Sequence, residues 1–197
     1  MSFIRKRGEY LPHWTDNDSY YHICFHLIDS LPSNVLQTWL FERKNIIAAA
    51  NLQKRDLTAE EKHQQALLYS KKVAFYLDKG CGYCYFWDEK CADIIVSALN
   101  FYNNIKYELY AWCVMPNHVH VIIKLNADND LFKIIHSWKS YSATRINQVL
   151  RQKGSLWHRD AYNRLIRNQK ELDATIKYVW ENPDKAGIKD WKYRYMR

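Results

Sequence analysis

The sequence has no run of about 18 apolar residues, which is the length that a membrane-spanning helix requires. Its first eight residues, Met-Ser-Phe-Ile-Arg-Lys-Arg-Gly, also lack the apolar stretch of a secretory signal peptide. These two absences argue against a membrane protein or a secreted one, and we expect a cytoplasmic protein. There is no internal repeat and no low-complexity segment either, so nothing indicates a repeat architecture.

The number of cysteines is small and odd, which argues against a disulfide framework. The chain has 5 cysteines, an odd number without an export signal, so reduced thiols are expected. The spacing of Cys81, Cys84 and Cys91 resembles part of a zinc site. No second pair completes a tetrahedral set of ligands, which favours packed or surface thiols.

Acidic residues are scarce in the last third of the chain. Residues 131–197 contain 15 Lys and Arg but only 6 Asp and Glu, whereas residues 1–130 contain 14 and 15. The formal net charge of +8 therefore comes entirely from the last third of the chain. A basic face confined to one region is typical of a protein that binds a polyanion.

The length and composition indicate one globular domain that covers residues 1–197. Apolar residues make up 48% and charged residues 25% of the chain, as in ordinary soluble proteins. We expect irregular arms at residues 1–19 and 188–197. Residues 33–80 offer no clustered chemistry and are predicted to be a helical insertion.

Apolar periodicity predicts four strands and five helices. The strands cover 20–28, 107–115, 115–123 and 161–166, and the helices cover 33–50, 58–79, 88–102, 131–153 and 169–181. Without the insertion after the first strand, the order is the β-α-β-β-α-β plan of a ferredoxin-like antiparallel sheet, with one extra helix at the C-terminal end. The predicted fold class is therefore α+β.

Several polar residues and breakers mark where these helices begin and end. Ser33 and Asp88 are suited to cap helices that start beside them, and Thr58 with Glu61 has the spacing of a capping box. Pro183 and Gly187 are expected to stop the last helix, because proline lacks a backbone N–H and glycine is common just after a helix end.

The strand at 115–123 carries the first chemical signal. His118 and His120 alternate with apolar residues, so their side chains lie on one face of the strand. Their side chains are rooted about 6 to 7 Å apart, a distance that two imidazoles can close around one divalent ion. Two ordinary strand histidines remain the simpler interpretation if this motif is taken alone.

The final predicted helix carries the second signal. Tyr178 and Asn182 are four residues apart and therefore lie one turn from each other on the same helix face. This spacing is common by chance. It acquires meaning if that face meets the histidines, where a phenol would lie beside a third metal ligand.

Three blocks of the sequence together resemble a known family. They are Met115-Pro-Asn-His-Val-His-Val-Ile-Ile123, Leu156-Trp-His-Arg-Asp-Ala-Tyr-Asn-Arg-Leu-Ile-Arg167 and Tyr178-Val-Trp-Glu-Asn-Pro-Asp-Lys-Ala-Gly187. In this order they are similar to the single-tyrosine HUH transposases, and within them to the REP-associated tyrosine transposases. Apart from the helical insertion, the resemblance covers roughly the whole chain.

The resemblance implies a role for individual residues. His118 and His120 match the HUH histidines that hold Mg²⁺ or Mn²⁺, Tyr178 matches the nucleophile, and Asn182 falls where relatives place a Gln or Asn that completes the metal site. Attack by the tyrosine would give a 5′-phosphotyrosine and free a 3′-hydroxyl. Asn163 departs from the pattern, because similar proteins have Asp there.

The implied substrate is single-stranded or hairpin DNA, and the implied activity is transposition by cleavage and rejoining. The basic residues expected to contact the DNA backbone are Lys133, Lys139, Arg145, Arg164 and Arg167. Similar transposases include homodimers as well as monomers. Two rival hypotheses stay open, namely a domesticated hairpin-binding protein that does not cut DNA and a metal-dependent phosphodiesterase that uses water.

Overall fold

The structure is a computed structural model that describes residues 4–7, 12–15, 19–58, 60–61 and 74–197. It divides into two compact units. One comprises Met1–Ile28 with Cys84–Arg197, and the other comprises Asp29–Tyr83. Within the described part of the chain, no helix is both long enough and apolar enough to cross a membrane.

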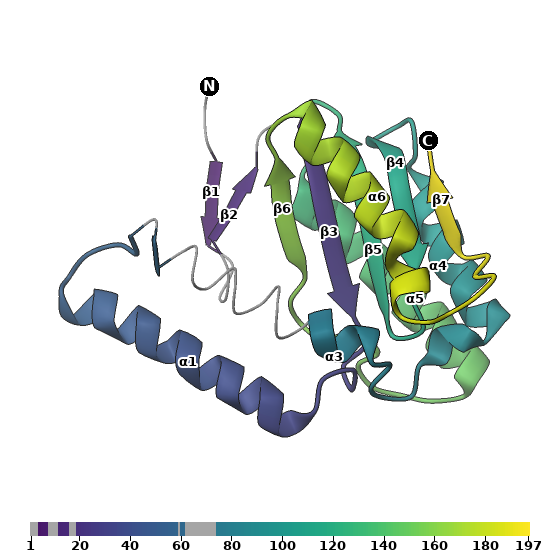
Figure 1. Ribbon diagram of the computed structural model, residues 1–197, viewed down its shortest axis with the longest axis horizontal. Helices are drawn as coiled ribbons and strands as arrows, with labels where there is room; N and C mark the ends of the chain where they lie inside the picture. Colours follow the sequence, from purple (N-terminus) through teal and green to yellow (C-terminus); the bar gives the residue numbers. More distant parts are fainter. Residues whose placement is uncertain (1–3, 8–11, 16–18, 59, 62–73) are drawn as a thin grey trace. The chain divides into compact units, whose positions relative to one another are not determined.

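The first unit is built on a five-stranded antiparallel sheet with the order β6-β3-β5-β4-β7 (Figure 1). The strands are β3 (Tyr20–His26), β4 (Tyr107–Val114), β5 (His118–Leu125), β6 (Tyr162–Ile166) and β7 (Arg194–Met196). The four predicted strands are all present, and the first of them lies between the third and the fourth. This order confirms the predicted ferredoxin-like α+β fold.

Three helices cover the two faces of this sheet. Helices α4 (Glu89–Phe101) and α5 (Leu131–Leu150) lie behind the sheet in Figure 1, and α6 (Gln169–Lys185) lies in front. A single 3₁₀ turn, η2 (Tyr85–Trp87), leads into α4. Among the helices described in this unit, α6, which carries Tyr178, is the one that lies on this face of the sheet.

The alternation along β5 divides the core between the two faces. Val119, Val121 and Ile123 are fully buried in the cluster that includes the inner faces of α4 and α5. Ile122 points the other way and packs in a second cluster with Val179 of α6. Each fully buried aliphatic side chain contributes roughly 1.5–3 kcal/mol of transfer free energy, so the period of two holds the strand in register.

The helices of this unit begin at side-chain caps. The carboxylate of Asp88 accepts a hydrogen bond from the backbone N–H of Lys90 at 2.9 Å, as predicted. Asp130 caps α5 in the same way, and Asn168 caps α6. These caps satisfy N–H groups that have no partner within the helix.

The prediction that Pro183 stops the last helix is wrong. Helix α6 runs through Pro183 to Lys185. A proline within a helix loses one hydrogen bond, but the ladder resumes at once, because the N–H of Ala186 bonds the carbonyl oxygen of Asn182 at 3.1 Å. The chain leaves the helix at Gly187, whose φ of +76° suits glycine.

The C-terminal segment forms an edge of the sheet, where an arm was expected. Strand β7 pairs with β4, and Tyr193 is only 6% exposed. The indole N–H of Trp191 donates to the carbonyl oxygen of Val114 at 2.8 Å. Aromatic residues interleaved with basic ones gave no clear strand period, which is why this strand was missed.

The N-terminal segment also differs from the irregular arm that was expected. Strands β1 (Ile4–Arg7) and β2 (Pro12–Thr15) form a separate two-stranded antiparallel sheet. Segments of four residues are too short to show a period of two above chance, so these strands could not be predicted.

The second unit contains helices α1 (Ser33–Leu52) and α3 (Ala74–Asp78). The cap position of α1 is Pro32, not Ser33 as predicted, and it forms no side-chain cap. The predicted capping box is present, because Thr58 N–H donates to Glu61 Oε2 at 2.8 Å and Glu61 N–H donates to Thr58 Oγ1 at 3.1 Å. Most of the helix predicted at 58–79 lies outside the described residues.

Candidate active site

The two histidines lie at the start of β5, on the face of the sheet that α6 covers. His118 is fully buried and His120 is 5% exposed. Their rings meet edge to face with centroids 4.9 Å apart. The alternation read from the sequence therefore places both imidazoles at one point under the helix, as predicted.

A neighbouring amide orients His118. Its Nδ1 lies 2.7 Å from Oδ1 of Asn117. An amide oxygen only accepts hydrogen bonds, so with the Asn117 amide in this orientation Nδ1 carries the proton and Nε2 carries a lone pair. Within the described part of the chain, Nε2 is buried without a hydrogen-bond partner. A buried lone pair of this kind is suited to a metal ion.

Helix α6 brings Asn182 to the same point. Its side chain is only 2% exposed, and its Nδ2 lies 3.5 Å from Nε2 of His120. Its Oδ1 is buried with no hydrogen-bond partner among the described residues. A rotation of the side-chain amide group by about 180° exchanges its oxygen and nitrogen, so either atom can face the histidine.

Tyr178 lies one turn before Asn182 and is partly exposed. Its ring centroid is 5.5 Å from that of His120, in an edge-to-face contact. The Nζ of Lys185 lies 5.3 Å from the centroid of the same ring. The structure thus brings together all four residues that were predicted to form the site.

His22 also belongs to this cluster, and the sequence analysis did not identify it as a site residue. It lies on β3, next to β5 in the sheet, and its Nε2 is 3.1 Å from Nδ1 of His120. Its ring also meets that of Tyr178, with centroids 6.1 Å apart. No signal in the sequence connects His22 to His120, because the pairing register of two distant strands cannot be read from either one.

Burial keeps these imidazoles neutral. It lowers the pKa of His120 to about 4 and is the main cause that lowers the pKa of His118 well below its usual value. The pKa of His22 is also well below its usual value, first because of burial and then because of His120 and Arg164. Neutral imidazoles have the lone pair that metal binding requires.

The donors available for a metal ion are two imidazoles and one amide. In the part of the chain that the structure describes, no group of three or more His, Cys, Asp and Glu side chains is arranged to hold a metal ion. Asn182 is therefore the residue in this cluster that can complete a set with His118 and His120. The buried lone pairs fit a divalent ion, and a set of two nitrogens and one oxygen suits Mn²⁺ better than Mg²⁺.

Lys139 was predicted to contact DNA, but its ammonium group bonds the protein itself. Nζ donates to the carbonyl oxygens of His158 and Arg159 at 2.8 and 2.9 Å. Burial lowers the pKa of this lysine to about 8. The side chain ties α5 to the segment that precedes β6.

The other basic residues of the prediction are exposed. Arg164 is paired with the carboxylate of Glu171, whereas the backbone N–H of Arg167 donates to Glu171 at 2.9 Å and leaves its side chain in solvent. Lys133 and Arg145 lie on the exposed side of α5. Because α5 covers the other face of the sheet, Lys133 and Arg145 lie opposite Tyr178, whereas Arg164 lies on β6 and Arg167 directly follows it.

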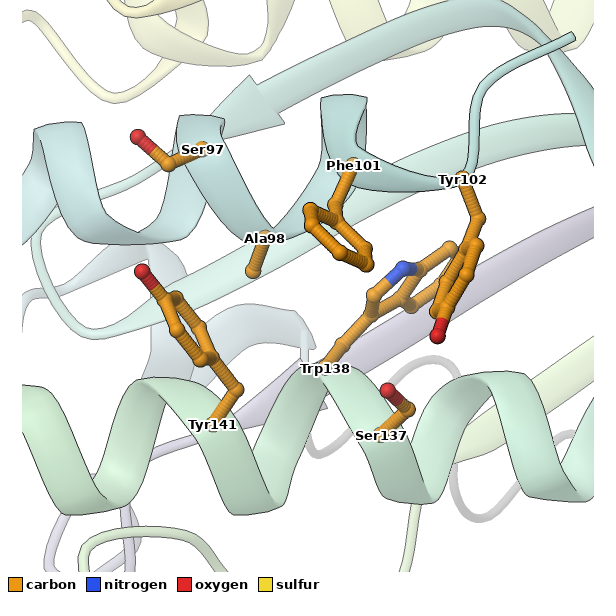
Figure 2. A pocket seen from close by; sticks show the side chains of 7 residues that line it. All are labelled: Ser97, Ala98, Phe101, Tyr102, Ser137, Trp138 and Tyr141. Atoms are coloured by element: carbon orange, nitrogen blue, oxygen red, sulfur yellow. The ribbon is translucent and has the colours of Figure 1, made fainter. Parts of the chain in front are cut away.

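An aromatic groove lies between α4 and α5 (Figure 2), with a volume of about 180 Å³. Trp138 lies at its base, and Phe101, Tyr102 and Tyr141 surround it. Because these helices cover the other face of the sheet, the groove is separate from the histidines and Tyr178. It contains none of the residues that were predicted to carry the chemistry.

Comparison with protein families gives a match that spans the site. The family described as "Transposase IS200 like" matches residues 86–182, which include His118, His120, Tyr178 and Asn182. A Haemophilus influenzae protein assigned as a REP-associated tyrosine transposase is 28% identical over 101 residues, which is 44% of this chain. The match covers 57% of that relative's own length.

Two solved structures are similar over most of the chain. One is a REP-associated tyrosine transposase bound to a REP hairpin, with 16% identity, a TM-score of 0.49, and coverage of 98% of this chain and 82% of the other. The second is a protein of Deinococcus radiodurans R1 assigned as a transposase, with 14% identity, a TM-score of 0.34, and coverage of 83% and 88%.

Proposed function

We propose that the protein is a metal-dependent transposase, because residues 86–182 match the family described as "Transposase IS200 like". It cleaves and rejoins single-stranded or hairpin DNA, with Tyr178 as the nucleophile. The observation that carries the proposal is the convergence of Tyr178 and Asn182 of α6 on His118 and His120 of β5. This convergence joins segments that are about 60 residues apart in the sequence.

The reaction begins with attack of the Tyr178 hydroxyl oxygen on a DNA phosphorus. A bond forms between the phenolic oxygen and phosphorus, the bond from phosphorus to the 3′ oxygen breaks, and the phenolic proton balances the 3′-hydroxyl that is released. Because the phosphotyrosine is itself a diester, a DNA 3′-hydroxyl can reverse the step without an energy source. Tyr178 is partly exposed, so a DNA strand can approach its hydroxyl group from solvent.

His118, His120 and Asn182 are the residues that would hold the divalent ion. When bound, such an ion polarises a phosphate and helps to orient it for in-line attack. The protein's own contribution is to keep both imidazoles neutral, to fix the proton of His118 on Nδ1 through Asn117, and to shield the ligands from water. Mn²⁺ or Mg²⁺ is the proposed cofactor.

The proposed DNA surface uses basic residues that face solvent and extends to α5, on the face of the sheet opposite Tyr178. Lys133, Arg145 and Arg167 are exposed, and Arg164 becomes available if a phosphate replaces Glu171 as its partner. Each lysine or arginine that neutralises a phosphate releases counterions, so affinity depends on salt. Lys139 is left out of this surface because backbone carbonyls already hold its ammonium group.

The proposal is tested with a labelled pool of hairpin oligonucleotides that carry randomised single-stranded flanks. The protein, its Tyr178→Phe variant and a control Tyr141→Phe variant are incubated with the pool and Mn²⁺, and covalent protein–DNA adducts are resolved on a denaturing gel. We expect adducts with the unmodified protein and with the control, and none with Tyr178→Phe.

The same experiment separates the rival functions. Binding of the pool without an adduct or cleavage would support a hairpin-binding protein. Metal-dependent cleavage that Tyr178→Phe retains would support a phosphodiesterase that uses water. Either result would overturn the transposase proposal.

A further inference from the structure

Strand β3 brings a third histidine against the proposed metal ligands. His22 is 8% exposed and lies on the face of the sheet that α6 covers. Its ring stacks on that of His120, with centroids 5.2 Å apart and planes at 24°. Its Nε2 is 3.1 Å from Nδ1 of His120, so one of these two nitrogens carries the proton and donates the hydrogen bond, and the other accepts it.

The two directions of this hydrogen bond have opposite consequences. If His22 donates, Nδ1 of neutral His120 accepts and its proton resides on Nε2, the atom that faces Asn182. His120 then has no lone pair for an ion. If His120 donates from Nδ1, its Nε2 carries the lone pair and Nε2 of His22 is the acceptor.

His118 shows which direction the site favours. Its Nδ1 faces Asn117 Oδ1 at 2.7 Å, an atom that can only accept. Metal-binding histidines generally donate their other ring N–H to such an acceptor, which fixes the tautomer and the ring orientation. His120 has His22 at the equivalent position.

We propose that His22 is a positioning residue for the metal site, which accepts the Nδ1 proton of His120 and thereby directs the Nε2 lone pair of His120 toward the ion. The inference rests on the proposed function, because it assigns His22 a task in that same site. The positioning role of His22 differs from a packing role in one respect. Packing requires only shape, whereas positioning requires an acceptor.

The packing alternative is real, because the ring of His22 also lies 6.2 Å from that of Tyr162 and 6.1 Å from that of Tyr178. A leucine at position 22 keeps an apolar contact but removes the acceptor. A glutamine keeps an acceptor at a similar distance from the backbone. The pair His22→Leu and His22→Gln therefore separates the two roles.

Two measurements on the full chain without DNA test the proposal. The first is the affinity for Mn²⁺, followed through the electron paramagnetic resonance signal of the free ion. We expect His22→Gln to bind within about threefold of the unmodified protein and His22→Leu to bind 10- to 100-fold more weakly, the range typical of such supporting residues. The control is Tyr20→Phe, two residues earlier on the same strand, where the hydroxyl bonds Tyr110.

The second measurement is the tautomer of His120 in the metal-free protein, from ¹⁵N NMR of the imidazoles. We expect the proton on Nδ1. Equal Mn²⁺ affinity for His22→Leu and the unmodified protein, or a proton on Nε2 of His120, would overturn the proposal.

The tautomer of His120 tests the role of His22 separately from the proposed metal-dependent function. If the unmodified protein binds no Mn²⁺, the metal site of the proposed function fails, and the tautomer alone then decides whether His22 accepts from His120. If His22→Leu does not fold, His22→Gln and the tautomer in the unmodified protein still decide the question.

Discussion

The side-chain Nδ2 of Asn182 lies 3.5 Å from Nε2 of His120, although 62 residues separate them in the sequence. This contact puts an amide beside an imidazole lone pair at the centre of the proposed metal site. We expect Asn182→Asp to bind Mn²⁺ more tightly, because a carboxylate is a stronger ligand than an amide for this ion. Asn182→Leu should bind it at least tenfold more weakly. Calorimetric titration of the DNA-free protein measures both effects, and equal affinity for all three proteins would remove Asn182 from the site.

The donor set also predicts a preference between metal ions. Two imidazoles and one amide favour Mn²⁺ over Mg²⁺, because Mg²⁺ prefers oxygen ligands and gives up its water reluctantly. Competition of Mg²⁺ against bound Mn²⁺ in the same titration measures the preference. Equal affinities for the two ions would indicate that the histidines do not ligate.

The β5 half of the site could be predicted from the sequence, because it depends only on local periodicity. A period of two places His118 and His120 on one face, and the structure confirms this. The position of His22 depends instead on how β3 aligns with β5, where Cys24 is the partner of His120. Such a register is set by the packing of the whole sheet, and one strand alone does not contain it.

Charge alone does not distinguish Lys139 from Lys133. Lys133 and Lys139 belong to the same helix, yet the first is exposed and the second is bonded to two backbone carbonyls at 2.8 and 2.9 Å. The difference arises from the segment 158–160, which reaches the helix only after the chain has folded. A basic residue is therefore a weak predictor of DNA contact until its surroundings are known.

We expect mutation of Lys139 to affect stability and mutation of Lys133 to affect DNA binding. Lys139→Met should lower the free energy of unfolding by about 2 kcal/mol, since hydrogen bonds from a charged group are lost, and urea unfolding measures this change. Lys133→Met should leave stability nearly unchanged but weaken hairpin binding and reduce the salt slope by about one counterion. Equal stability of the two variants would contradict the structural role of Lys139.

Buried histidines make the stability depend on pH. His26 stacks on His158 with centroids 4.7 Å apart, and burial, followed by the charge of His158, lowers the pKa of His26 to about 3. The unfolded value is about 6.5, so between these two values the unfolded chain binds the extra proton. The free energy of unfolding should therefore fall as the pH decreases from about 6.5 toward 3.

The variant His26→Gln isolates this contribution. Its unfolding free energy should fall less steeply with decreasing pH, by up to about 1.4 kcal/mol per pH unit, because one proton is no longer taken up on unfolding. Urea unfolding of both proteins at several pH values between 4.5 and 7 makes the comparison. Parallel curves would show that His26 is not held neutral in the folded protein.

The most direct test of the account is to locate the covalent DNA link by mass spectrometry. The adduct formed with the hairpin pool and Mn²⁺ is digested with trypsin and nuclease, and the peptide that retains a nucleotide is sequenced. We expect the 5′-phosphate to be attached to Tyr178, on the helix that carries Asn182. A link to any other of the 15 tyrosines, or cleavage of the DNA without any link, would contradict it.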